Sequence, residues 1–497
     1  MQDFTFKKML KIVEPFGSPK DEHLDDLAKH MVKPTRTESK KIPAGYTYFG
    51  QFVDHDISLD SKSRIYPWQP VDLSDIVNKR VPAFDLETVY GIDIEPDEKN
   101  PVVRKHLREA GTPFLKLGKT SFRLDTKVKR SFDHDLPRHL QSTEAILVDG
   151  RNDENLLVAQ THVAFIKFHN AIALNLSGSV DARFEEARRK TIRYYQHIVR
   201  FDFLPKIIKK TVLDDIIANG CPHYDPKNNG MFVPVEYSVA AYRMGHSMVR
   251  SRYNINSLHA GTHLNMLTVF TGSRSGSGSP SMMGLESLPS DWIIDWNLFY
   301  NIDDSKNRFS NTFNFAFKIN TQISRALGNI GMFSDFRKNS IPALDLYRGR
   351  LFELPPGQLV AKTLTGQADR LPSAEIKKLL PQGVRDIFDV DTPLWFYILA
   401  EAEIEANSNG GSGAETEIDP MGEVGSRLVG ETFIALLRES EASILREPLT
   451  SVEKAFVGVE NDGYFGMPEM LKFIEKVNNP TNNPPGLFLN PVGTVQI

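Results

Sequence analysis

The chain has 497 residues, of which 40% are hydrophobic and 25% are charged, a composition typical of an ordinary globular protein. Its formal net charge of −4 provides no basic excess for nucleic acid or an anionic membrane surface, so neither is expected as a partner. The single cysteine excludes an internal disulfide, and no apolar run reaches the roughly 20 residues of a membrane-spanning helix.

The beginning of the chain alternates charged and apolar positions and contains several Pro and Gly residues that interrupt regular structure. Residues 21–32 are predicted to form one short helix. We interpret residues 1–44 as an arm and residues 45–497 as the body. Residues 1–16 are of mixed charge, without the basic start and apolar run of a signal peptide. We therefore expect a cytoplasmic protein, or one exported without a classical signal peptide.

An aromatic run ends in Asp54, His55 and Asp56, with Gln51 four residues ahead of the histidine. On a helix, Gln51 and His55 would share one face. A neutral imidazole beside an amide, at the edge of an apolar pocket, can move a proton on a small polar substrate. The alternative is a surface histidine between two solvated acids.

An acidic loop follows at residues 82–91 and includes Asp85. Carboxylates and carbonyls at alternating positions are what Ca²⁺ takes from a loop, since it binds six to eight oxygens. An ordinary polar turn has the same composition.

Long helical patterns cover residues 156–176 and 182–210. His162 and His169 lie on the buried stripe of the first pattern, where histidines of a packed core are expected more than metal ligands. Arg151 directly precedes this helix, and a guanidinium at such a place needs an anion or a polar partner.

A further helix is predicted over residues 235–249, where Gly245 precedes His246. Glycine within a helix costs about 1 kcal/mol relative to alanine and suits a place where a flat group approaches the backbone. Residues 271–284 are rich in Gly and Ser and predict a surface loop. Helices are also expected over residues 291–300 and 312–327.

The segment from Gly50 to Asp56 resembles the distal-histidine motif of the animal-type haem peroxidases, in the peroxidase–cyclooxygenase superfamily. Four further segments resemble the family in the same order, at residues 151–170, 195–205, 235–249 and 341–350. The pattern is most similar to bacterial myeloperoxidase-like members. The resemblance implies a mainly α fold, a single large helical domain around a buried haem b.

The resemblance also implies residue roles. His55, Arg151 and Gln51 would be the catalytic residues on the distal side of the haem, and His246 would be the axial ligand of the haem iron.

On the proximal side, Asp345 stands where the family supports the axial histidine, and mammalian members carry asparagine there. A carboxylate bonded to the ring N–H makes the imidazole more electron-rich. Arg348 matches an arginine that binds a haem propionate. Arg243 lies three residues before the axial histidine, as in the peroxidases, whereas dioxygenases carry a radical-forming tyrosine at that position.

Family members can bind haem through ester links, and Asp54 and Glu154 occupy the two positions that form them. Two free carboxylates are the alternative. By the same resemblance, Asp56 and Asp85 are candidate ligands of a calcium ion.

The resemblance thus implies a haem peroxidase that reduces hydrogen peroxide via a ferryl intermediate, oxidises small organic donors or halides, and serves the response to oxidative stress. Two alternatives stay open. One is a haem fatty-acid dioxygenase. The other is a non-catalytic haem-binding adhesion or matrix protein, against which the intact Gln51, His55 and Arg151 argue.

Overall fold

The computed structural model describes most of the chain, and every structural statement below concerns the described residues. These are residues 4–12, 19–60, 72–93, 95, 102–122, 128–140, 144–264, 287–302, 312–331, 334–367, 370–408, 420–460, 463–478 and 488–493. The predicted Gly/Ser loop at 271–284 lies outside them.

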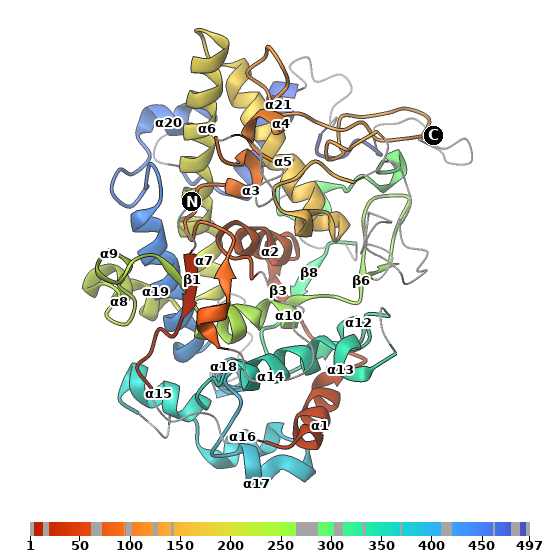
Figure 1. The fold of residues 1–497 in the computed structure, drawn as a ribbon. Coiled ribbons are helices and arrows are strands. Elements are labelled where there is room, and N and C mark those ends of the chain that lie inside the picture. The colour runs from red at the N-terminus through yellow and green to blue at the C-terminus, as the bar shows by residue number, and fades with distance from the viewer. Residues whose placement is uncertain are drawn as a thin grey trace.

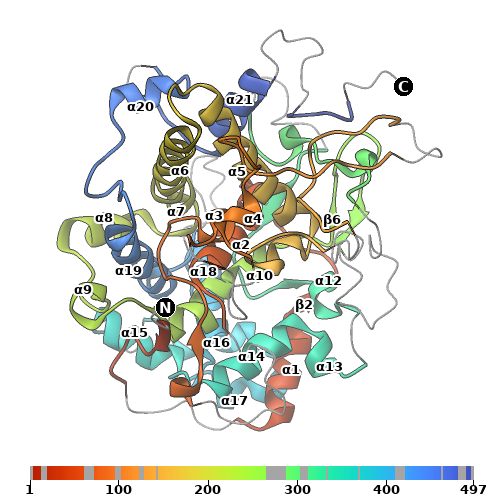
Figure 2. The same ribbon diagram turned by 45° about the horizontal axis from the view of Figure 1, so that its top comes forward.

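Helices dominate the described residues (Figure 1), so the predicted mainly α fold is confirmed. The centre is built from α2 (Gly45–Ile57), α5 (Leu156–Leu174) and α6 (Val180–His197). Both views place α2 between α5 and α14 (Ile341–Leu351) (Figure 2). Nearly every residue of α5 is buried, which is the expected behaviour of a helix that is apolar on all sides.

Aromatic side chains fix how α2 packs on α5. The rings of Phe52 and Phe165 are stacked with centroids 5.0 Å apart, and Tyr195 of α6 meets Phe165 edge-on at 5.6 Å. Such pairs stabilise beyond the area that they bury, by about 0.5–1.5 kcal/mol each. The helix that carries His55 is therefore held rigidly at the centre of the fold.

Helix α6 continues beyond His197 without a break in direction. A π-helical segment, η3 (Ile198–Phe203), follows it and leads into α7 (Leu204–Ile207). Pro205 stands in the first turn of α7, where its missing N–H is tolerated.

The predicted helix over 235–249 is irregular. It consists of a π turn, η4 (Glu236–Ala240), a 3-10 turn, η5 (Ala241–Met244), and a short helix, α10 (Gly245–Met248). These turns pack against α18 (Leu394–Ser408) and α19 (Glu423–Glu439).

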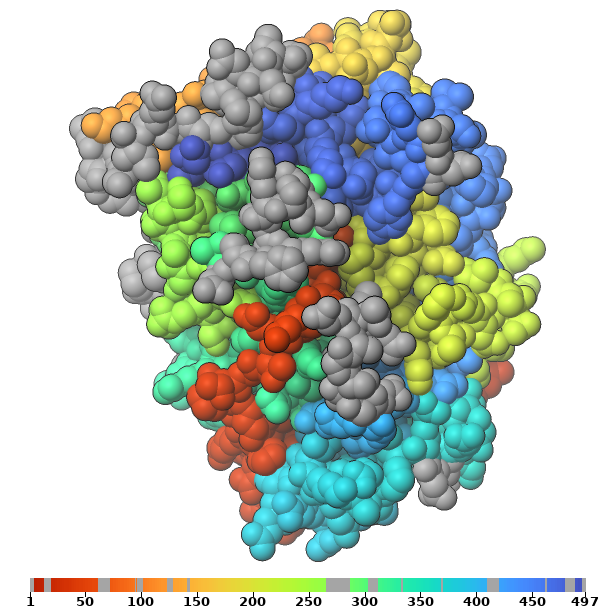
Figure 3. Space-filling model, turned by 180° about the vertical axis from the view of Figure 1, so that it is seen from behind, coloured from red at the N-terminus to blue at the C-terminus, as the bar shows by residue number. Residues whose placement is uncertain are grey.

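The N-terminal residues cover the outside of these layers. Strand β1 (Phe4–Lys7) pairs antiparallel with β4 (Val77–Asn78) and parallel with β5 (Phe232–Pro234). Helix α1 (Asp21–Met31) begins and ends close to the prediction and buries its apolar stripe against α14. Figure 3 shows the N-terminal residues, in red, on the surface of the rear face.

The remaining strands form two-stranded pairs: β2 (Val32–Lys33) with β9 (Ile323–Ser324), β3 (Glu38–Pro43) with β8 (Phe315–Phe317), and β6 (Arg252–Tyr253) with β7 (Thr262–His263). The remaining helices are α3 (Glu87–Tyr90), α4 (Arg104–Leu107), α8 (Lys210–Asn219), α9 (Pro226–Asn229), α12 (Arg325–Gly328), α13 (Phe336–Asn339), α15 (Gly357–Thr365), α16 (Ser373–Leu379), α17 (Arg385–Phe388), α20 (Ser451–Phe456) and α21 (Met467–Asn478). The 3-10 turns are η1 (Leu73–Asp75), η2 (Gly150–Asp153), η7 (Ser290–Trp292), η8 (Trp296–Leu298) and η9 (Gln382–Val384). Among the described helices, none has both the length and the apolar content to cross a bilayer.

Two predicted helices are wrong. Residues 291–300 form only the turns η7 and η8, because their backbone groups bond to distant parts of the chain. The N–H of Asp295 donates to the carbonyl of Ile255, and that of Trp296 donates to the carbonyl of Leu489. Residues 312–327 form β8, β9 and the short α12. Phenylalanines alternate with other residues over 313–317, which is the period of a strand.

Candidate active site

A cavity of about 610 Å³ lies between α2 and the segment around α10, a size usual for cofactor and ligand sites. It brings together residues that are far apart in the sequence. All of the sequence-predicted residues except Asp345, Asp56 and Asp85 line it, namely Gln51, Asp54, His55, Arg151, Glu154, Arg243, His246 and Arg348.

On the α2 side, His55 is 5% exposed and its Nδ1 lies 2.8 Å from the amide oxygen of Asn152. The amide nitrogen of Asn152 lies 3.0 Å from Nδ1 of His162. With this amide orientation, His55 donates from Nδ1 and keeps a lone pair on Nε2. Burial lowers the pKa of His55 to about 3, and the charge of Arg151 acts in the same direction. The imidazole is therefore neutral at pH 7.

Arg151 is held by Asp149, which lies two residues before it. Its Nη2 lies 2.7 Å from one carboxylate oxygen, and it also donates to the carbonyl of Ser58. Arg80 donates to the same carboxylate from Nε at 3.2 Å. Burial alone would raise the pKa of Asp149, but the two arginines outweigh it and hold that pKa far below its usual value. The Arg151 cation is thus fixed at the wall of the cavity.

Asn152 and Asp149 were missed as site residues by the sequence reasoning. The available signal was their position beside Arg151, at a helix start rich in polar side chains. Gln51 also has a partner there, because Asn155 donates from Nδ2 to its Oε1 at 3.1 Å.

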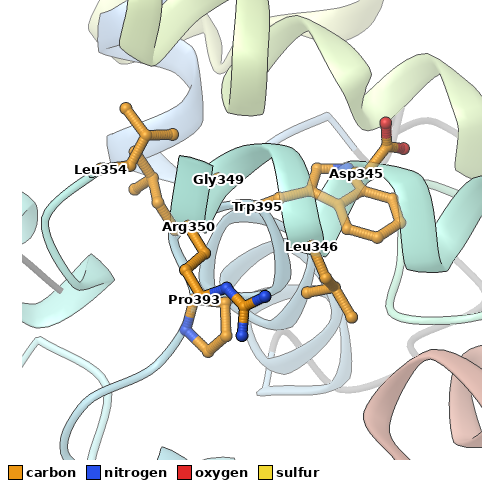
Figure 4. A pocket seen from close by; sticks show the side chains of 8 residues that line it. Asp345, Leu346, Gly349, Arg350, Leu354, Pro393 and Trp395 are labelled. Atoms are coloured by element: carbon orange, nitrogen blue, oxygen red, sulfur yellow. The ribbon is translucent and has the colours of Figure 1, made fainter. Parts of the chain in front are cut away.

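Across the cavity, His246 at the start of α10 lies with Nδ1 2.5 Å from the carboxylate of Asp345 on α14. Arg243 donates from Nη1 to the other oxygen of this carboxylate at 2.8 Å. Burial acts to raise the pKa of Asp345, but His246 and Arg243 outweigh it and lower that pKa. Figure 4 shows Asp345 at one end of a small pocket, opposite Arg350 and near Trp395 of α18.

The other imidazole nitrogen of His246, Nε2, has no hydrogen-bond partner among the described residues. Beside it, a Cβ added to Gly245 would meet no heavy atom within 4 Å, although Gly245 lines the cavity. The surrounding protein therefore does not demand a glycine here, and the backbone at this point is open to the cavity.

Residues 73–282 match the family model of the animal haem peroxidases. This segment, less than half of the chain, is similar to the animal haem peroxidase domain. Chorion peroxidase of Drosophila melanogaster is 33% identical over 120 residues, 22% of this chain and 15% of the relative. The peroxidase-like protein of Margaritifera margaritifera is 28% identical over 183 residues, 35% of this chain and 22% of the relative. The matched regions thus span under a quarter of each relative's length.

Two solved structures share the fold. Peroxidase A from Dictyostelium discoideum superposes with a TM-score of 0.56 at 15% identity, over 91% of this chain and 90% of that one. The fatty acid alpha-dioxygenase of Oryza sativa gives a TM-score of 0.53 at 14% identity, over 96% and 81% of the two chains.

Members of the family bind haem, and the cavity fits this group in three respects. It offers an imidazole bonded to a carboxylate, an open surface at Gly245, and the cation of Arg348. Burial, and secondarily the charge of Arg243, lower the pKa of Arg348 to about 10, so its guanidinium is still charged at pH 7 and suits a carboxylate.

The candidate calcium ligands lie outside the cavity. Asp56 is buried and accepts from the backbone N–H groups of Leu86, at 3.1 Å, and Thr88, at 3.4 Å. Burial raises the pKa of Asp56 to about 8, and the charge of Asp85 adds to this rise. Burial, aided by the charge of Glu441, raises the pKa of Asp85 to about 7. Within the described ranges, no group of three or more His, Cys, Asp or Glu is arranged as a metal site.

The two histidines of α5 belong to the core, as predicted. His169 lies 3.0 Å from both the hydroxyl of Tyr90 and the carbonyl of Pro113, and His162 is bonded to Asn152.

Proposed function

We propose that this protein is a haem-dependent peroxidase that reduces hydrogen peroxide and oxidises small organic donors. One observation carries the proposal: a single cavity is lined on one side by the neutral His55 beside Arg151, and on the other by His246 bonded to a carboxylate. A non-catalytic scaffold has no need of such an acid–base residue paired with a fixed cation.

Haem, when bound, supplies the redox chemistry. Nε2 of His246 would bind its iron, and Arg348 would hold a propionate. The Asp345 carboxylate keeps the proton of His246 on Nδ1. This contact orients the ring and makes the imidazole a stronger electron donor to the iron.

His55 acts as the acid–base residue. Its Nε2 takes the proton from one oxygen of hydrogen peroxide and gives it to the other oxygen, which leaves as water. Arg151, fixed by Asp149, stabilises the negative charge that develops as the O–O bond breaks. Gln51, held by Asn155, positions a water or a halide next to this site.

Two finer features belong to the same proposal. Asp54 and Glu154 line the cavity and are proposed to form ester links to haem. Asp56 and Asp85 are proposed to bind Ca²⁺. In support of the latter, the hydroxyl of Thr88 is buried and has no partner among the described residues, and its N–H bonds Asp56.

A fatty-acid dioxygenase is the second candidate, because a plant alpha-dioxygenase covers 96% of this chain in superposition. The radical-forming tyrosine that this chemistry requires is replaced by Arg243. Its neighbour Tyr242 is buried, and its hydroxyl donates to the carbonyl of Gly50 at 3.0 Å.

The test compares two activities of the haem-loaded protein. We expect peroxide-dependent oxidation of guaiacol and no uptake of oxygen with palmitic acid. His55→Gln should lower guaiacol oxidation by about 10²–10⁴-fold, the usual contribution of a general acid–base residue. His263→Gln, on the exposed side of β7, should leave it unchanged. Oxygen uptake with palmitic acid, without guaiacol oxidation, would contradict the peroxidase proposal and favour the dioxygenase.

A further inference from the structure

Asp202, in the π-helical segment η3, is 1% exposed and accepts hydrogen bonds from two tyrosine hydroxyls. Tyr46 donates to both of its carboxylate oxygens at 2.8 Å. Tyr464 donates to Oδ1 at 2.5 Å, and the N–H of Met467 donates to Oδ2 at 2.8 Å. π-Helical turns within helices are frequent at functional sites, yet the proposed peroxide chemistry does not use this carboxylate.

The two tyrosines lie in opposite environments. Tyr46 lies in the first turn of α2 and is 3% exposed. It lines the cavity that also contains His55 and His246. Tyr464 is 52% exposed, with its hydroxyl turned inward to the carboxylate. Because both hydroxyls bond Oδ1 of Asp202, a continuous hydrogen-bonded path joins a residue of the cavity wall to an exposed tyrosine.

The surroundings keep this path intact. Lys206 donates to Asp202 from Nζ at 2.5 Å, and its ammonium lies 4.4 Å from the centre of the Tyr46 ring. Burial and the Asp202 charge raise the pKa of both Tyr46 and Tyr464 well above the usual value, so both phenols keep their protons. A Cβ on Gly466 would come within 2.5 Å of Asp202, so the close approach requires glycine.

We propose that Tyr46, Asp202 and Tyr464 form a relay that carries single electrons from phenolic donors at the surface to the oxidised haem. The protein would then oxidise phenolic substrates that are too large to enter the cavity. This inference rests on the proposed peroxidase function, which supplies the oxidant: haem that has reacted with hydrogen peroxide.

Each step of the relay moves one electron and one proton. Tyr46 gives an electron to the oxidised haem, and its phenolic proton passes to Asp202. Tyr464 then gives an electron to the Tyr46 radical. Its own proton goes to Asp202 while the first proton returns to Tyr46. The Tyr464 radical finally takes one hydrogen atom from the phenolic O–H of the donor, which leaves as a phenoxyl radical.

The surface around Tyr464 suits an aromatic, anionic donor. Phe201 is 41% exposed, and its carbonyl lies 3.5 Å from the Tyr464 hydroxyl. The guanidinium of Arg200 lies 4.9 Å from the centre of the Phe201 ring. An exposed aromatic pair beside a cation would contact phenol rings and attract carboxylates.

The experiment uses haem-loaded protein, hydrogen peroxide and two donors: guaiacol, and a random copolymer of glutamate and tyrosine that is too bulky for the cavity. We expect Tyr464→Phe to lower the initial rate of dityrosine formation in the copolymer by about tenfold or more while guaiacol oxidation is unchanged. Tyr194→Phe is the matched control, because it also loses one tyrosine hydroxyl, which donates to the Glu453 backbone instead of Asp202. It should leave both rates unchanged.

A second measurement locates the radical. After peroxide and a nitroso spin trap, mass spectrometry should find the label on Tyr464 in the wild type and lose it from Tyr464 in Tyr46→Phe. A Tyr464→Phe protein that still cross-links the copolymer at the wild-type rate would overturn the relay and leave the peroxidase function standing. If the wild type oxidises neither the copolymer nor guaiacol, both the relay and the peroxidase function are overturned.

Discussion

At the residue scale, the two histidines of the cavity differ in the partner of Nδ1. His55 faces a neutral amide and is buried beside a cation, which keeps it an uncharged base. His246 faces the Asp345 carboxylate, which pushes electron density into the ring. In the proposed reaction, the same side chain would thereby serve proton transfer on one side of the cavity and metal ligation on the other.

Replacing Asp345 by Asn tests this difference. The amide would still accept a hydrogen bond from His246 but would carry no charge, so the imidazole would become a weaker donor. We expect the Fe(III)/Fe(II) midpoint potential of the haem-loaded protein to rise, and the rate of its reaction with peroxide to fall by about 10–100-fold. Redox titration and stopped-flow absorbance measure the two quantities.

Asp389→Asn is the matched control, because Asp389 is a buried carboxylate bonded to Ser373 and does not line the cavity. A potential that is the same in Asp345→Asn and Asp389→Asn would contradict the role given to Asp345.

The residues that the sequence motifs indicated do meet, but their partners could not be derived from spacing. The contact between His246 and Asp345 joins residues 99 positions apart, and the resemblance alone indicated it. Asn152 was overlooked because an asparagine at a helix start is ordinarily a capping residue. Only the fold brings it against His55 and His162.

At the scale of elements, helices with a strong apolar period were predicted well. Helices α1, α5 and α6 begin or end within a few residues of the prediction, because their buried stripes are set by local sequence. The segment of π and 3-10 turns from Glu236 to Met244 and the short strands β8 and β9 were not foreseen. Their backbone geometry is decided by contacts with α18, α19 and the N-terminal strands.

Helix α2 places functional groups on two faces within two turns. Gln51 and His55 face the cavity, whereas Asp56 faces the loop before α3 and lies beside Asp85. One rigid element would therefore couple a calcium site to the position of the acid–base histidine.

A calcium effect on stability should depend on pH. The pKa values of Asp56, about 8, and Asp85, about 7, lie above their unfolded value of 3.8. The stability that the protonated pair contributes is therefore fully present below pH 3.8 and is lost as the pH rises through 7 to 8. Ca²⁺ binds the ionised pair, so it should raise the Tm over that in EDTA clearly at pH 8 and little at pH 5.

Differential scanning calorimetry measures this effect, with Mg²⁺ as the control cation. Asp56→Asn should abolish the response to Ca²⁺. An equal Tm in Ca²⁺ and EDTA at pH 8 would contradict the proposed site.

At the scale of the whole molecule, the cavity is assembled from distant parts of the chain. Its walls come from α2, from the segment around η2, from α10 and from α14, and the helical core holds these parts in place. The fold shared with the solved structures accounts for this arrangement, whereas the choice between peroxidase and dioxygenase rests on the side chains that the cavity presents.

The most direct measurement is the reaction of haem-loaded protein with one equivalent of hydrogen peroxide, followed at the Soret band by stopped flow. The wild type and the His263→Ala control should react rapidly and equally. His55→Ala should react about 10²–10⁴ times more slowly, because the base that moves the peroxide proton is lost. Equal rates in wild type and His55→Ala would contradict the assignment of His55, and with it the peroxidase account of this cavity.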